Sequence, residues 1–147
     1  MNSYKKHKKD GVYYCEDSPR FIDESAIDSL HKESLKINKD IVRLCLHENE
    51  SSELMSMLIL VRNFYKYPPH RHNWKDECYT VIKGSMDYQE FNEDGKILIT
   101  KSLKKGETLL NSSRGFHTIN PTNKVLCFIE TTVGPFIDRP LEFINKT

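Results

Sequence analysis

The sequence has little of what marks a nucleic-acid-binding or membrane protein. Among 147 residues, 22 Lys and Arg stand against 21 Asp and Glu, so the formal net charge is only +1. A nucleic-acid-binding domain usually gathers a basic excess on one face, and a membrane-spanning helix needs about 20 consecutive apolar residues. The chain has neither feature, and no apolar stretch follows its basic start as in a secretory signal. We therefore expect no nucleic-acid partner, no membrane contact and a cytoplasmic location.

Cysteine is also scarce. The four cysteines, Cys15, Cys45, Cys78 and Cys127, are widely separated and form no CxxC pair. The sequence thus lacks the short ligand spacing of a zinc knuckle. In a reducing compartment such residues stay free thiols and pack as small hydrophobic side chains. The one basic cluster, at residues 5–9, is typical of a frayed, solvated chain end.

Only one segment has a helical pattern. Apolar residues recur at three- to five-residue intervals over 22–37, with acidic side chains in the first turns, where the helix dipole favours negative charge. From residue 40 onward, short runs rich in β-branched and aromatic residues are separated by turn signals. The predicted strands are 41–46, 53–63, 70–73, 78–82, 86–91, 97–103, 108–110, 116–119 and 125–132, with a further short strand at 12–14. This pattern predicts one all-β barrel or sandwich, with an N-terminal extension (1–39) carrying the helix, a barrel (40–140) and a tail (141–147).

Two histidines and an acid stand close together in the middle of the chain. Residues 69–77 read Pro-His-Arg-His-Asn-Trp-Lys-Asp-Glu, so His70 and His72 are two positions apart. Side chains alternate faces along a strand, which points both imidazoles the same way with Cα atoms roughly 7 Å apart. From there both can reach one ion at about 2.1 Å. A short connection brings Glu77 onto the next strand, and a later antiparallel strand can bring His117 to the same point. The four side chains predict a metal site.

Such a ligand set leaves the metal partly open. Three neutral imidazoles and one carboxylate give a divalent ion a net charge near +1 and leave two positions of an octahedron for water or a substrate. The ligands do not name the ion, so Fe, Mn, Ni, Co and Zn all stay open. Asp76 is an alternative to Glu77, but the strand alternation that points Tyr79 and Val81 inward favours Glu77.

The spacing resembles the first cupin motif, as His70-x-His72-x4-Glu77-x6-Gly84, and residues 106–117 resemble an incomplete second one. Four positions that shape turns differ from the usual motif residues: Phe64 for Gly, Ser112 for Pro, Arg114 for Gly and Pro121 for Asn. None of the four is a ligand. The resemblance implies a single cupin barrel (a double-stranded β-helix, or jelly roll) with a short N-terminal helix and one divalent metal ion.

A closer resemblance covers most of residues 41–136. The segments that carry it are Arg43-Leu44-Cys45-Leu46-His47, Tyr67-Pro68-Pro69-His70-Arg71-His72, Phe91-x3-Gly95, Phe116-His117-Thr118 and Glu130-Thr131-Thr132-x-Gly134-Pro135-Phe136. Together they resemble the WbuC-type cupin metalloproteins, whose genes typically lie among those for cell-surface polysaccharides. The resemblance implies a substrate from O-antigen or capsule synthesis. The chain departs from that family at 141–144, where Leu-Glu-Phe-Ile replaces an Ala-Pro-Trp-type terminus.

Further side chains are candidates for the chemistry beside the metal. Arg43 and His47 can bind an anionic substrate group, although such residues also pair with acids on a barrel surface. Glu130 is a candidate general acid or base, as is His47, and Glu130 can also orient a ligand histidine or form a buried structural ion pair. Tyr79 is expected to line the substrate pocket as a barrel-lining aromatic side chain.

Three functions are compatible with these residues. The first is an isomerase- or epimerase-like enzyme acting on a sugar or sugar nucleotide, with the ion as Lewis acid. The second is an Fe(II)-dependent dioxygenase, and the third is a non-catalytic module that binds a small acid or sugar. A metal-free epimerase has no need of paired histidines with an acid. We also expect a homodimer, because an open strand edge such as 53–63 needs cover.

Overall fold

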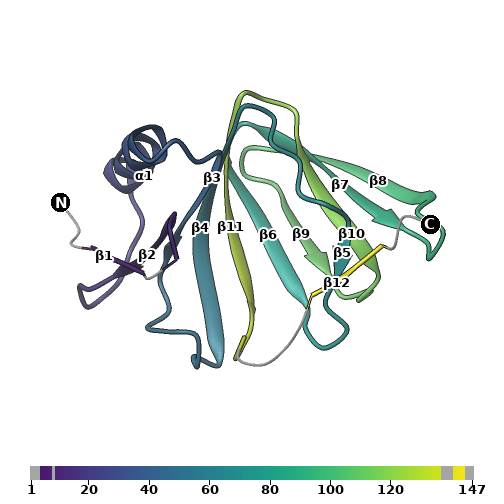
Figure 1. Cartoon of the computed structure of the whole chain (residues 1–147), viewed down its shortest axis with the longest axis horizontal. Helices are drawn as coiled ribbons and strands as arrows, with labels where there is room; N and C mark the ends of the chain where they lie inside the picture. Colours follow the sequence, from purple (N-terminus) through teal and green to yellow (C-terminus); the bar gives the residue numbers. More distant parts are fainter. Residues whose placement is uncertain (1–3, 8, 137–140, 145–147) are drawn as a thin grey trace.

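The computed structural model describes residues 4–7, 9–136 and 141–144, which form two facing sheets and one helix (Figure 1). A seven-stranded sheet has the order β1-β2-β3-β4-β11-β6-β9, and a five-stranded sheet the order β12-β5-β10-β7-β8. The strands are β1 (Tyr4–Lys6), β2 (Val12–Cys15), β3 (Ile41–Cys45), β4 (Leu54–Arg62), β5 (His70–Arg71), β6 (Glu77–Lys83), β7 (Ser85–Phe91), β8 (Ile97–Lys104), β9 (Thr108–Asn111), β10 (Phe116–Pro121), β11 (Val125–Val133) and β12 (Glu142–Phe143). The predicted all-β barrel with a short N-terminal helix is confirmed.

The helix α1 (Glu24–Lys36) begins two residues later than predicted because Asp23 caps it. The Asp23 side chain accepts a hydrogen bond of 2.8 Å from the backbone N–H of Ala26, which satisfies one of the unpaired donors of the first turn. At the other end Ile37 is the C-cap and Asn38 has a φ of 50°, a left-handed conformation that commonly ends helices. The predicted helix is therefore present, with slightly shorter bounds.

The strand β4 is buried almost throughout because both of its faces are covered. Met57, Ile59 and Val61 belong to the apolar cluster inside the barrel. The alternate residues Leu58 and Leu60 belong to a second cluster under α1, which lies on the outer side of β3 and β4 in Figure 1. Strands buried on both faces lose the usual alternation of polar and apolar residues. This arrangement leaves the barrel interior to the side chains on one face of each strand.

The nine strands predicted beyond residue 40 are all present, with ends displaced by at most two residues. Two short strands were not predicted. At the N-terminus β1 pairs with β2, and Lys6 forms an ion pair of 2.9 Å with Asp10. The expectation of a frayed end is therefore wrong for the described part of the basic cluster. Lys8 lies outside the described residues. At the other end β12 pairs with β5. The predicted extension and tail thus join the two sheets, and their boundaries stay a prediction.

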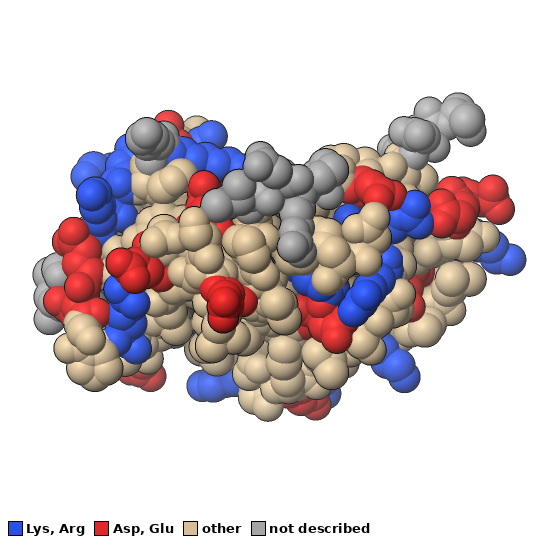
Figure 2. Space-filling view, turned by 90° about the horizontal axis from the view of Figure 1, so that it is seen from below, with Lys and Arg blue, Asp and Glu red and all other residues tan. Residues whose placement is uncertain are grey.

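Other sequence expectations concern the surface. The strand β4 has no open edge, because β3 and β11 flank it, so the reason given for a homodimer is wrong. The homodimer itself stays a prediction. All four cysteines are free thiols, and no helix in the described part of the chain is long and apolar enough to cross a membrane. Over most of the face in Figure 2, Lys and Arg side chains are interspersed with Asp and Glu.

Two residues that replace motif glycines adopt the backbone conformation that favours glycine. Phe64 has a φ of 55° and Arg114 a φ of 56°, a left-handed conformation that costs a residue with a Cβ roughly 1–2 kcal/mol. Gly84, which matches the motif, has a φ of 81°, and a Cβ there would lie 2.6 Å from the carbonyl oxygen of Val125. The turns require this conformation at all three positions, whichever residue occupies them.

Replacing Arg114 by glycine is expected to raise the free energy of unfolding by about 0.5–1 kcal/mol, because the relieved strain exceeds the entropy that glycine adds to the unfolded chain. The exposed ion pair between Arg114 and Asp76, 3.4 Å apart, contributes little against this gain. Urea unfolding of the metal-free protein measures the change. Gly84→Ala is the control, and it should lower the free energy of unfolding because a Cβ there would clash with the carbonyl oxygen of Val125. An Arg114→Gly protein no more stable than the parent would contradict the expectation.

Candidate metal centre

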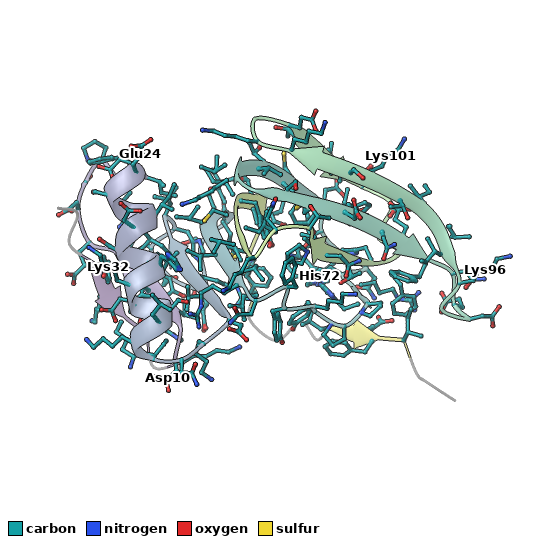
Figure 3. The ribbon with its side chains drawn as sticks, turned by 90° about the horizontal axis from the view of Figure 1, so that it is seen from above. Asp10, Glu24, Lys32, His72, Lys96 and Lys101 are labelled. Atoms are coloured by element: carbon teal, nitrogen blue, oxygen red, sulfur yellow. The ribbon has the colours of Figure 1, made fainter. Side chains whose placement is uncertain are left out.

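Three histidine rings and one carboxylate meet inside the barrel. His70 lies in β5, His72 follows it, Glu77 begins β6 and His117 lies in β10. The ring centroid of His70 lies 4.8 Å from that of His117 and 5.2 Å from that of His72. The centroids of His72 and His117 are 6.1 Å apart. Figure 3 shows His72 in the interior, whereas Lys96 and Lys101 lie along the outer β7–β8 hairpin. We refer to these four side chains as the quartet.

The Glu77 carboxylate joins the quartet. Its Oε1 lies 3.3 Å from Nε2 of His72, and its Oε2 lies 2.9 Å from Nε2 of His117. The alternation of β6 explains its direction, since Glu77, Tyr79 and Val81 are buried. The side chain of Asp76 is 43% exposed and pairs with Arg114. The structure therefore brings Glu77 to the histidines and leaves Asp76 outside.

Strand pairing and backbone carbonyls hold the histidines. His117 stands directly opposite His70 where β10 pairs with β5. The Nδ1 of His70 lies 3.1 Å from the carbonyl oxygen of Pro68, and the Nδ1 of His117 lies 2.9 Å from that of Gly115. An Nδ1–H donated to a carbonyl orients the ring so that Nε2 faces the centre, the usual arrangement of metal-binding histidines.

Burial keeps two of the histidines neutral. It lowers the pKa of His70 to about 4 and that of His72 to about 3. Burial also acts to lower the pKa of His117, but the hydrogen bond and charge of Glu77 outweigh it, so that pKa is raised. For Glu77 burial acts to raise the pKa, but the hydrogen bond from His117 and the charge of Lys75 hold it well below its ordinary value. Glu77 is thus ionised, and its carboxylate accepts a hydrogen bond from Nε2–H of His117.

A lysine that the sequence analysis did not single out completes the cluster. The side chain of Lys75 is only 1% exposed, and its Nζ lies 2.7 Å from Oε1 of Glu77 and 3.5 Å from Oε1 of Glu130. The ammonium also lies 4.4 Å from the ring centroid of Phe136. Lysine is rarely buried unless it is paired, so the residue type alone gives no indication that Lys75 is buried. Its position between the ligand candidates His72 and Glu77 was the one available signal.

Two donor-to-donor distances in the quartet have the spacing of metal ligands, but the four side chains are not closed around one point. Atoms bound to one ion at about 2.1 Å lie roughly 3 Å from each other, which is the size of the two distances from Glu77 to the histidines. In the part of the chain that the structure describes, no three His, Cys, Asp or Glu side chains form a finished metal site. The residue types of the quartet suit a divalent ion, and binding one would require His117 to give up its proton and Lys75 to release Glu77.

Glu130 and Tyr79 lie opposite each other where β11 pairs with β6. Burial raises the pKa of Glu130, and the charge of Lys75 opposes that rise only in part. Tyr79 is 2% exposed, and its hydroxyl lies 3.4 Å from Nε2 of His117. Tyr79 therefore contacts the quartet, while Glu130 lies beside Lys75.

Arg43 and His47, the two predicted anion-binding residues, line the cavity that opens beside the quartet. The Nδ1 of His47 lies 3.0 Å from the carbonyl oxygen of Ser56, and its ring packs edge-on against Tyr14. Burial lowers the pKa of His47, so the ring is neutral near pH 7. Within the described residues His47 makes no hydrogen bond or ring contact with the quartet, whereas the charge of Arg43 lowers the pKa of Glu130. The structure brings Glu130 and Tyr79 to the centre and does not bring His47 there.

A cavity of about 380 Å³ opens beside the quartet. Its wall is largely apolar, with side chains from β3, β4 and β11 that include Ile41, Met57, Ile59, Val61 and Phe128. Arg43, Lys75 and Glu130 supply charged groups, and His7 and Lys9 extend the lining to the N-terminal segment. An apolar pocket with a few charged groups is the usual form of a small-molecule site.

The model of a protein family described as a domain of unknown function, DUF6016, matches residues 22–103, more than half of the chain. The chain belongs to the DUF6016 family. The range that matches DUF6016 contains His70, His72 and Glu77 and ends before His117. A comparison with curated proteins finds none that matches this DUF6016 chain.

Several solved structures are similar in fold to this DUF6016 chain. A Klebsiella pneumoniae protein described as having a double-stranded β-helix domain aligns with a TM-score of 0.57 and 16% identity over 74% of this chain and 83% of that one. KdgF from Halomonas sp. aligns with a TM-score of 0.53 and 17% identity over 67% and 82%. A cupin superfamily protein from Desulfitobacterium hafniense aligns with a TM-score of 0.50 and 13% identity over 63% and 76%. These similarities show the fold, which is a single cupin barrel.

The metal-free protein is expected to lose stability as the pH falls below about 6.5, the ordinary pKa of histidine. Folded His72, with a pKa of about 3, stays neutral while the unfolded chain takes up the proton. Because the unfolded state then binds more protons, His72 alone lowers the unfolding free energy by about 2 kcal/mol between pH 7 and pH 5. Urea unfolding across this range should show a flatter profile for His72→Gln. His31→Gln, in α1, is the matched control, and a His72→Gln profile parallel to the parent's would refute the expectation.

Proposed function

We propose that this chain is a metal-binding cupin in which His70, His72, Glu77 and His117 hold one divalent ion. The observation that carries the proposal is the meeting of three imidazoles and a carboxylate from separate segments inside a barrel whose core is mainly apolar. Burying such groups is costly unless they are paired or bind a cation. Nitrogen and oxygen donors of this kind accept Fe, Mn, Ni, Co or Zn, and supply in the cell decides among them.

The adjoining cavity is the proposed binding site for a small molecule. Its volume of about 380 Å³ lies in the range of ligand pockets and suits a ligand of the size of a monosaccharide. The proposed substrate is a sugar or sugar-nucleotide intermediate of cell-surface polysaccharide synthesis. Support for that class comes from the resemblance to WbuC-type cupins, membership of which is part of this proposal.

In the proposed reaction, a bound divalent ion would supply Lewis acidity at a ligand oxygen. Glu130 is the candidate proton donor, because burial raises its pKa and it lines the cavity next to Lys75. Arg43 offers a positive charge to an anionic group of the ligand. The apolar wall excludes water from the reacting atoms and strengthens these interactions.

Elemental analysis tests the metal site. We expect about one divalent ion per chain in the parent protein and almost none when His70 and His72 are both replaced by alanine, because loss of two of four ligands removes most of the binding free energy. Binding of the metal ion should also raise the midpoint temperature of unfolding of the parent protein, since the ion binds only the folded state. His47→Ala is the matched control, as it removes a buried cavity histidine outside the quartet. Equal metal content in the double variant and the parent would refute the site.

Turnover tests the enzymatic part of the proposal. Metal-loaded protein incubated with a pool of nucleotide sugars should convert at least one of them, as followed by mass spectrometry. Glu130→Gln should lower the rate by about 10²–10⁴-fold, the usual contribution of a general acid or base. Oxygen consumption by iron-loaded protein that depends on substrate would instead indicate a dioxygenase.

A non-catalytic binding module is the second candidate, and the largely apolar cavity wall favours it. Such a wall binds a ligand by burying it and needs no group to move a proton. Tight binding of a sugar without conversion, unchanged by Glu130→Ala, would establish this function. Loss of binding in that variant together with measurable conversion in the parent would exclude it.

A further inference from the structure

The ammonium of Lys75 lies where it competes with a metal ion for Glu77. Its Nζ is 2.7 Å from Oε1 of Glu77, the same oxygen that lies 3.3 Å from Nε2 of His72. An ion bound to His72 and to this oxygen would lie within a few ångströms of the ammonium. Since the Lys75 side chain is 1% exposed, little water separates the two charges.

Lys75 also has a second carboxylate within reach. Glu130 Oε1 lies 3.5 Å from Nζ, and the ring of Phe136 covers the ammonium at 4.4 Å. A buried charge that loses its partner is strongly destabilising, so an ammonium released by Glu77 needs another anion close by. Glu130 meets that need, which gives Lys75 two alternative partners along one side of the cavity.

We propose that Lys75 is an internal competitor of the metal ion. A cation binds only if its affinity for the quartet exceeds the free energy needed to displace the ammonium of Lys75 from Glu77 towards Glu130. The inference rests on the proposed metal site and adds a residue that determines which ions enter it. The competition weakens binding of every divalent cation by a similar factor. Ions that bind nitrogen and oxygen donors tightly, such as Zn²⁺ and Ni²⁺, still bind. Mn²⁺ binds such donors weakly, so its affinity is too low to displace Lys75.

Lys75 has an opposite role to consider, in which it orients Glu77 for the metal. Hydrogen bonds that orient a ligand typically improve metal affinity by about 10–100-fold. The ammonium of Lys75 and a divalent ion a few ångströms away repel each other strongly, because little water enters the site. This repulsion exceeds the gain in affinity from orienting Glu77. The charge of Lys75 therefore dominates, and its removal should tighten binding.

Zinc and manganese affinities of the purified full-length protein test the proposal. The variants are Lys75→Met, which keeps the length of the side chain and removes its charge, and Lys83→Met as the matched control. Lys83 ends β6, the strand that Glu77 begins, and is exposed, so its replacement changes the net charge equally without touching the quartet. Competition with a chromogenic chelator at constant pH and ionic strength gives both affinities.

Lys75→Met is expected to bind Zn²⁺ at least about tenfold more tightly than the parent and Lys83→Met, and to bind Mn²⁺ where the parent does not. If Lys75→Met does not fold, the double variant Lys75→Met/Glu130→Gln removes both charges of the second pair and supports the same comparison. Equal or weaker Zn²⁺ binding in the folded variant would overturn the inference. Absence of Zn²⁺ binding in the parent would overturn the proposed metal site itself, so the two failures are distinct.

Discussion

A carboxylate in the middle of an apolar barrel has to be neutralised, and the neutralisation of Glu77 governs the arrangement around it. Its side chain is 3% exposed, and its partners are the ammonium of Lys75 and the imidazoles of His72 and His117. His72 and Lys75 lie in the connection before β6, and His117 lies in β10 of the second sheet. Removing the charge of Lys75 would leave the buried carboxylate under-compensated, which is among the most destabilising changes in a protein.

The two sheets deliver these groups with little freedom. Glu77 begins a strand that pairs with β11 on one side and β9 on the other, so its direction is fixed by the alternation of three adjacent strands. His117 is held by β7 and by the carbonyl oxygen of Gly115. A candidate centre built on paired strands is more rigid than one built on loops. The connection that carries His72 and Lys75 is the part of the centre without such support, and it is also the part where the proposed competition between a metal ion and the ammonium would take place.

Much of the fold could be predicted from the sequence because the barrel strands are short, rich in β-branched residues and bounded by turn residues. The inward direction of Glu77 followed from strand alternation alone. Lys75 could not be predicted, since its charge favours water in any local analysis and only tertiary contacts with Glu77 and Glu130 reverse that preference. The strands β1 and β12 are too short to have a periodic pattern, and they form because an existing strand offers hydrogen bonds.

The strand β5 consists of only two residues, His70 and Arg71, and it lies between β10 and β12. It pairs with β10 at His70 and with β12 at both residues, while Arg71 bonds to Glu142 at 2.7 Å. So few backbone hydrogen bonds cost little to break compared with the long ladders of β4, β6 and β11. Local fraying at this rim would therefore move His70 away from the other three side chains of the quartet while the longer ladders of the barrel stay paired.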